Sequence, residues 1–148
     1  MTRLIIGIAL LLVCSYVGVQ INRYYKQKNL IFSDLAELMK VIMTEIRFRK
    51  SKKSEIFGSY RFTSQELKAL TEENYNSPYL DRAENNAIRT YFDGFGKYDL
   101  TSETKNAEIF NAKAIGMLAK SEKDLKEKGK LYFQLCVLLG LALCIVII

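Results

Sequence analysis

The residue types that most often carry out catalysis are scarce in this chain. Its 148 residues include no histidine, so the commonest general base and the commonest metal ligand are both missing. The three cysteines, Cys14, Cys136 and Cys144, lie inside apolar stretches, where a thiol is an ordinary small hydrophobic group. Gly94 and Gly96 do not follow a strand pattern, which a dinucleotide-binding loop requires. The sequence therefore predicts a protein that is not an enzyme and that binds no metal or cofactor.

One run of charged side chains indicates a binding role instead. Its cations are Arg47, Arg49, Lys50, Lys52 and Lys53. Cations this close together can hold anionic lipid headgroups or an acidic surface of a partner protein. A solvated loop is the alternative interpretation, because Glu55 follows closely and the net charge of the chain is only +6. Nucleic acid is not an expected partner, since aromatic residues are not interleaved with this basic run.

Two uncharged stretches predict helices that cross a membrane. No charged residue occurs from Leu4 to Asn22 or from Leu131 to Ile148, and each stretch approaches the ~20 apolar residues that span a bilayer as a helix. We therefore expect transmembrane helices at 1–22 and 131–148 and a helical domain at 23–130, with the second span continuing the last helix of the domain. Basic residues lie next to the inner ends of both spans, which predicts that the domain is cytoplasmic.

The first apolar stretch has a second interpretation as an export signal. A short basic start before an apolar run is typical of a signal peptide, and Cys14 would then be the lipidated residue of an exported lipoprotein. A retained span is favoured, because Val13 stands where a lipoprotein cleavage site has Gly, Ala or Ser. A small membrane protein that acts by oligomerisation of its spans is a further alternative, with Cys14 and Gly18 spaced for close helix contact.

The stretch between the spans has the periodicity of helices and not of strands. Apolar residues recur at three- and four-residue spacing on two faces. The first face consists of Leu35, Leu38, Met39, Ile42 and Ile46, and the second of Ala107, Phe110, Ala114, Met117, Ser121 and Leu125. Because no run alternates with a period of two, the fold class is predicted to be all-α, with one long helix from Thr101 to the end of the chain.

Shorter helices are predicted between these two faces. Thr63 and Glu66 have the spacing of a capping box at the start of one helix. Ser77 followed by Pro78 is typical of the start of another. The buried face of that second helix is predicted to carry Ala83, Ala87, Ile88 and Tyr91, and its end to lie at Gly94 and Gly96. A short helix from about Ser54 to Phe57, ended by Gly58, is expected after the basic run.

Two short motifs are similar to those of one protein family. Gly96, Asp99 and Ser102 match a Leu-Gly-x-x-Asp-x-x-Ser-Gln-x-x pattern that opens the family's last long helix, and Glu103 stands where the family usually has Gln. Residues 45–48, Glu-Ile-Arg-Phe, look like the family's Glu-Ile-x-Tyr motif. With the two terminal spans, these residues make the chain resemble stage III sporulation protein AB of endospore-forming bacteria over almost its whole length.

The basic run is a departure from the family pattern. Where the family usually has Gly and then Pro-Leu after the Glu-Ile-x-Tyr motif, this chain has Arg49 and then Lys52 and Lys53. The chain also lacks the tryptophan often found in the middle of the domain.

The resemblance implies a fold and a set of partners. The fold would be a helical bundle similar to the cytoplasmic domains of type II secretion F proteins, flanked by N- and C-terminal transmembrane helices. The protein would belong to the mother-cell membrane around the forespore, in a channel or secretion-like complex. Its partners would be a secretion-type ATPase, stage III sporulation protein AA, the other components of the same complex, and membrane lipid.

Two features are then the candidate partner-binding residues. They are the basic run and the turn that contains Gly96, Asp99 and Ser102. A solely structural role for the turn is the alternative, in which it ends one helix and starts the next with Thr101 or Ser102 as N-cap.

Overall fold

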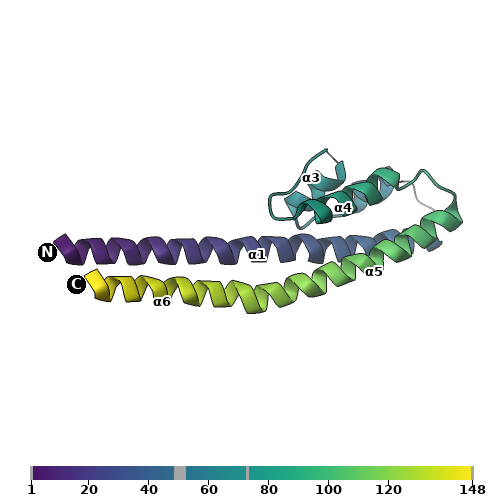
Figure 1. The fold of residues 1–148 in the computed structure, drawn as a ribbon. Helices are drawn as coiled ribbons and strands as arrows, with labels where there is room; N and C mark the ends of the chain where they lie inside the picture. Colours follow the sequence, from purple (N-terminus) through teal and green to yellow (C-terminus); the bar gives the residue numbers. More distant parts are fainter. Residues whose placement is uncertain (1, 49–52, 73, 148) are drawn as a thin grey trace. The chain divides into compact units, whose positions relative to one another are not determined.

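All the regular secondary structure that the computed structural model describes, in residues 2–48, 53–72 and 74–147, is helical, so the all-α prediction is confirmed. The elements are α1 (Thr2–Phe48), α2 (Lys53–Ser59), α3 (Gln65–Glu72), α4 (Arg82–Gly94), α5 (Leu100–Asp124), the π-helical turn η1 (Leu125–Gly129) and α6 (Lys130–Ile147) (Figure 1). The chain divides into two compact units. We call residues 1–27 with 121–148 the terminal unit, and residues 28–120 the central unit.

Small residues bring the two helices of the terminal unit close together. A Cβ atom on Gly7 would lie 4.0 Å from the Cβ of Cys144, and one on Gly140 would lie 3.1 Å from the Cβ of Cys14. Residue numbers rise along α1 as they fall along α6, so the two helices are antiparallel and the two ends of the chain lie side by side (Figure 1). Helices in membranes often pair where small residues let their backbones approach.

The outward faces of the terminal unit are apolar. Side chains more than half exposed include Ile5, Ile8, Leu12, Val13, Leu138, Leu139, Ile145 and Val146. Two helices of the described chain, one near each end, are long and apolar enough to cross a membrane. Because soluble proteins rarely expose so continuous an apolar surface, these faces indicate contact with lipid, and the chain is associated with a membrane.

The core of the central unit joins the two predicted apolar faces. On α1, Leu35, Leu38, Met39 and Ile42 are fully buried, and on α5, Ala107, Phe110 and Ala114 are buried with them. Aromatic side chains from α2 and α4 complete the cluster: Phe57 lies edge-on to Phe92, with ring centroids 5.6 Å apart. Both helical faces predicted from the periodicity are therefore confirmed.

A buried carboxylate connects α1 to the loop before α3. Asp34 is 2% exposed. It accepts hydrogen bonds from the Tyr60 hydroxyl at 2.7 Å, the Thr63 amide at 3.1 Å and the Ser64 amide at 2.8 Å. Three donors for one charged group satisfy the requirement that a buried carboxylate be fully hydrogen-bonded. We call these four residues the Asp34 latch.

The latch explains why the predicted start of α3 is wrong. Thr63 was expected to cap the helix together with Glu66, but its amide is bound to Asp34. The N-cap is instead Ser64, whose hydroxyl accepts the amide of Leu67 at 3.3 Å. Glu66 accepts the hydroxyl of Tyr75 at 3.0 Å.

The start and the buried face of α4 also differ from the prediction. Ser77 and Pro78 precede the helix by several residues, and the N-cap is Asp81, which forms a reciprocal capping box with Glu84. The buried face carries Glu84, Asn85, Ile88 and Phe92, whereas Ala83 is exposed. Polar residues can be buried on this face because they form hydrogen bonds within the fold. The spacing of apolar residues alone does not predict such buried polar positions.

The chain stays helical from Leu100 to Ile147, as the single long helix that was expected, but one of its turns is π-helical. The turn η1 separates α5 from α6, and its Gly129 packs against Asn22 and Tyr25 of α1. At the start, α5 begins at Leu100. Gly58 lies within α2 and does not end it.

Candidate functional site

The turn between α4 and α5 is organised by a buried glutamate. The Oε1 atom of Glu103 accepts the amide of Gly96 at 2.7 Å and the amide of Tyr98 at 3.2 Å. Gly96 has a φ of 86°, a left-handed conformation that residues with a Cβ rarely adopt. The position that departs from the family pattern, Glu103, therefore holds the turn through two backbone donors.

Asp99 is the N-cap of α5, in place of the predicted Thr101 or Ser102. Its carboxylate accepts the amide of Ser102 at 3.3 Å, and its carbonyl accepts the amide of Glu103 at 2.9 Å. The hydrogen bonds from Ser102 lower the pKa of Asp99. All three turn residues predicted to bind a partner, Gly96, Asp99 and Ser102, thus have structural roles, and the exposed surface of the turn remains available beside them.

Lys53, the last residue of the basic run, lies against this turn. A Cβ atom on Gly96 would be 3.8 Å from the Cβ of Lys53. The Lys53 ammonium donates to the carbonyl of Phe92 near the end of α4 and lies 5.8 Å from the centroid of the Phe57 ring. Burial lowers the pKa of Lys53, and the charge of Asp93 partly opposes this effect. The structure therefore brings Lys53 to the turn, although the two are far apart in the sequence and were predicted as separate features.

The other described member of the basic run lies at a different helix. Arg47 forms an ion pair with Glu108 on α5, with 2.8 Å between Nη2 and Oε1, and both side chains are about half exposed. Exposed pairs of this kind contribute little to stability, roughly 0–1 kcal/mol. The three remaining predicted residues, Arg49, Lys50 and Lys52, lie outside the described residues.

A groove runs between α4 and α5 and reaches the same turn. Its volume is about 540 Å³. Small residues of α4, Ala83 and Ala87, line one side, and Ile109 and Phe110 of α5 line the other. Ile109 is 61% exposed, although it is a large apolar residue.

Stacked aromatic rings form part of this groove. Tyr91 and Phe110 are almost parallel, with ring centroids 4.1 Å apart. The Tyr91 hydroxyl has no hydrogen-bond partner within the described chain, and burial raises the pKa of Tyr91, with a further contribution from the charge of Glu103. The groove was not predicted from the sequence, because the spacing of Ala87 and Tyr91 is that of an apolar helix face that packs into a core.

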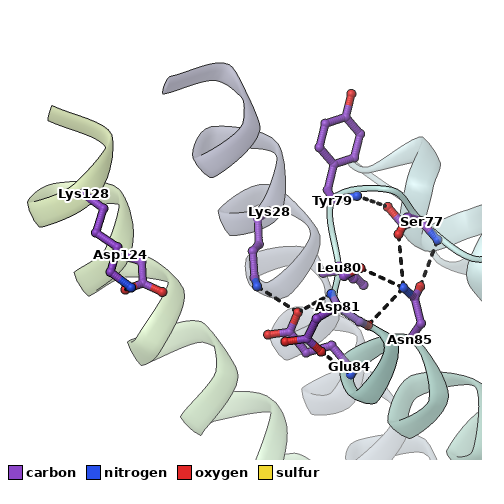
Figure 2. Close-up of polar contacts among 9 residues, drawn as sticks. All are labelled: Lys28, Ser77, Tyr79, Leu80, Asp81, Glu84, Asn85, Asp124 and Lys128. Atoms are coloured by element: carbon purple, nitrogen blue, oxygen red, sulfur yellow. Dashed lines mark hydrogen bonds and ion pairs between the residues drawn. The ribbon is translucent and has the colours of Figure 1, made fainter. Parts of the chain in front are cut away.

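A compact polar network positions α4. Asn85 donates to the carbonyls of Ser77 at 3.1 Å and Leu80 at 3.0 Å, and accepts the amide of Ser77 at 2.9 Å (Figure 2). Glu84 forms a 2.8 Å ion pair with Lys28 of α1, and both side chains are nearly buried. Figure 2 also shows a separate, more exposed pair in the terminal unit, between Asp124 and Lys128 at 2.8 Å.

The ion pair between Lys28 and Glu84 gives a testable prediction. Glu84→Gln is expected to lower the free energy of unfolding by about 1–3 kcal/mol, because it leaves a nearly buried ammonium without its counter-charge. Glutamine can still accept the amide of Asp81, so the helix cap is retained. Thermal unfolding of the full chain in detergent, followed by circular dichroism, measures the change. The exposed Glu72 provides the control: if Glu72→Gln destabilises the chain equally, the ion pair is not the cause.

The described residues contain no group of three or more His, Cys, Asp or Glu side chains placed to hold a metal ion. What the site offers is a surface: an ordered turn, the end of a basic run and an adjoining groove, all within the central unit.

The comparisons with known proteins give one match. The sequence model of stage III sporulation protein AB matches residues 63–148, which is more than half of the chain and includes α3, the groove, the turn and the last helices. No curated protein and no solved structure matches the chain.

Proposed function

Because this chain belongs to the stage III sporulation protein AB family and therefore has a role in sporulation, we propose that it is a non-enzymatic membrane platform that docks a secretion-type ATPase. The ATPase is stage III sporulation protein AA. The platform belongs to the channel or secretion-like complex between mother cell and forespore. It lies in the mother-cell membrane around the forespore, with its central unit in the cytoplasm.

The contact between Lys53 and Gly96 is the observation that supports this proposal most directly. It makes Lys53, the last residue of the basic run, a neighbour of the turn within one unit, so one partner surface can contact both. Arg47 and Lys53 are already engaged by Glu108 and by the carbonyl of Phe92. We therefore assign the steering of an acidic partner to the three remaining cations of the run, Arg49, Lys50 and Lys52, which lie outside the described residues.

The two candidate spans support a platform role through their position in the sequence. One begins before the central unit and runs into it, and the other leaves it and ends after it. A unit attached to a membrane at both its ends is suited to hold a soluble ATPase at that membrane. Binding alone performs this role, and no catalytic group is required.

The test is a binding assay between the full chain in detergent and the purified ATPase of the same organism. Arg49→Glu, Lys50→Glu and Lys52→Glu are combined in one variant, and Arg47 and Lys53 stay unchanged because they make structural contacts. We expect the variant to lose binding by at least about tenfold, because charge reversal adds like-charge repulsion to the loss of attraction.

The matched control reverses three exposed lysines elsewhere on the central unit, Lys40, Lys68 and Lys105, and is expected to bind normally. If the wild-type chain does not bind at micromolar concentration, the direct ATPase contact is wrong. If both variants lose binding equally, the effect reflects net charge and not the basic run.

A further inference from the structure

The antiparallel pairing of the terminal unit gathers cations at one end of the helix pair. Asn22 and Tyr25 of α1 both lie beside Gly129, at 3.3 Å and 3.7 Å from the position of its missing Cβ. Arg23 and Lys26 are therefore at the same level as the cations of η1 and α6. We call Arg23, Lys26, Lys126 and Lys130 the basic collar.

The four collar side chains have no counter-charge of their own. All four residues are exposed, and within the described part of the chain none of them has an ion-pair partner. Lys128, in contrast, is paired with Asp124 at 2.8 Å. Exposed lysines and arginines that lack a carboxylate partner remain able to bind an anion from outside the protein.

The collar stands where lipid headgroups would be. The uncharged stretches from Leu4 to Asn22 and from Leu131 to Ile148 end next to it, and as helices each is about 27–29 Å long, close to the thickness of a hydrocarbon core. Tyr24 and Tyr132 are partly exposed at the same level, and tyrosine is enriched at membrane interfaces. The ends of the uncharged stretches, the two tyrosines and the four cations therefore all indicate that the basic collar lies at the level of the lipid headgroups.

From this placement we propose that the basic collar is a binding site for the phosphodiester headgroups of anionic phospholipids. Cations of both helices lie at the level of the contact of Asn22 with Gly129, so one headgroup at that level can be reached from α1 and from η1 or α6. Such a contact would hold the two helices in register. This proposal is independent of the ATPase partner and extends the function to a requirement for lipid composition.

The experiment uses the full chain purified in a zwitterionic detergent. Phosphatidylglycerol or phosphatidylcholine is added, and bound lipid is counted by native mass spectrometry while the unfolding midpoint is followed by circular dichroism. Phosphatidylglycerol is expected to bind and to raise the midpoint, and phosphatidylcholine to do neither. Glycerophosphoglycerol, the phosphodiester that remains when phosphatidylglycerol loses its acyl chains, is expected to leave the midpoint unchanged.

The variant combines Arg23→Gln, Lys26→Gln, Lys126→Gln and Lys130→Gln, and its affinity for phosphatidylglycerol is expected to fall by at least about tenfold. The control removes the same charge from the central unit, with Arg82→Gln, Lys40→Gln, Lys68→Gln and Lys105→Gln, and is expected to bind normally. Equal binding by the collar variant, or an equal loss in the control, overturns the proposal.

A second measurement covers a collar variant that fails to fold. For the wild-type chain, raising the salt concentration from about 0.1 M to about 1 M should weaken the effect of phosphatidylglycerol, because the Debye length falls from about 10 Å to about 3 Å. An effect of phosphatidylglycerol that is independent of salt contradicts an electrostatic collar. No ATPase is present in either assay, so failure here is distinguishable from failure of the platform function.

Discussion

Asp34→Ala is expected to lower the unfolding midpoint of the central unit by about 10–20 °C, which corresponds to a loss of about 3 kcal/mol. The substitution removes the acceptor for the Tyr60 hydroxyl and for two backbone amides, one of them at the buried Ser64. Alanine is the best helix former, so any gain in helix propensity on α1 opposes the expected loss. Near-ultraviolet circular dichroism of the full chain in detergent reports the tyrosine environment directly.

The control and a milder variant separate the latch from general effects on α1. Glu37 is exposed on the same helix, and Glu37→Ala should leave the midpoint nearly unchanged. Tyr60→Phe removes one donor of three and should cost about 1 kcal/mol. If Asp34→Ala unfolds at the same temperature as Glu37→Ala, the latch does not stabilise the unit.

The latch also predicts how stability depends on alkaline pH. Burial, together with the hydrogen bond to Asp34, raises the pKa of Tyr60 well above its usual range. A group with a raised pKa in the folded state contributes its full stabilisation below its ordinary pKa and loses it as pH rises further. Stability should therefore decline above about pH 10, and Tyr60→Phe should reduce that decline.

Gly140→Leu is expected to separate the two helices of the terminal unit. A Cβ atom at this position would lie 3.1 Å from the Cβ of Cys14 and 3.6 Å from the Cα of Leu11, so a larger side chain meets backbone that cannot move aside easily. In membranes, helix pairing depends on such close contact of small residues. The expected effect is loss of the pairing and not a small shift of it.

Disulfide trapping measures the pairing. A Cβ on Gly7 would be 4.0 Å from the Cβ of Cys144, within the usual range of a disulfide. In a chain with Cys14→Ser and Cys136→Ser, Gly7→Cys should therefore cross-link to Cys144 on oxidation. Peptide mass spectrometry identifies the bond.

Adding Gly140→Leu should abolish this cross-link within one chain, whereas Ala142→Leu should preserve it, because it adds the same bulk at an outward-facing position. Cross-linking that survives Gly140→Leu contradicts the close contact at Gly140. Cross-linking that Ala142→Leu also abolishes shows that bulk alone, and not the contact, controls the pairing.

The sequence predicted the buried faces of α1 and α5 correctly but not the helix starts. The faces that carry Leu35 and Ala107 were predicted correctly, because long apolar periodicity reports burial directly. The starts of α3 and α4 were wrong, because several residues near each start have capping side chains. Tertiary contacts decide which of these residues is the N-cap. The Thr63 amide is bound by Asp34, and Asp81, not Ser77, caps α4.

The candidate site, too, was predicted only where the sequence carries a local signal. The turn was located from Gly96, Asp99 and Ser102, but its main organiser, Glu103, was noticed only as a departure from a motif. Glu103 accepts hydrogen bonds from backbone amides of its own turn, and this arrangement leaves no periodic pattern in the sequence. Only the folded structure therefore reveals it. The groove was missed because Tyr91 is apolar enough to be assigned to a core, although its ring faces Phe110 at the edge of that core.

The shared core of α1 and α5 has a consequence for synthesis of the chain. Phe110 and Ala114 are made ~75 residues after Leu35, so the apolar face of α1 lacks its partners on α5 for about 4–15 s at ordinary translation speed. Contacts between residues this far apart also form slowly, because a long loop must close first. The time that the ribosome spends between Ile46 and Phe110 therefore sets how long the nascent chain is open to aggregation, and slow codons in this interval should lower the yield of folded protein.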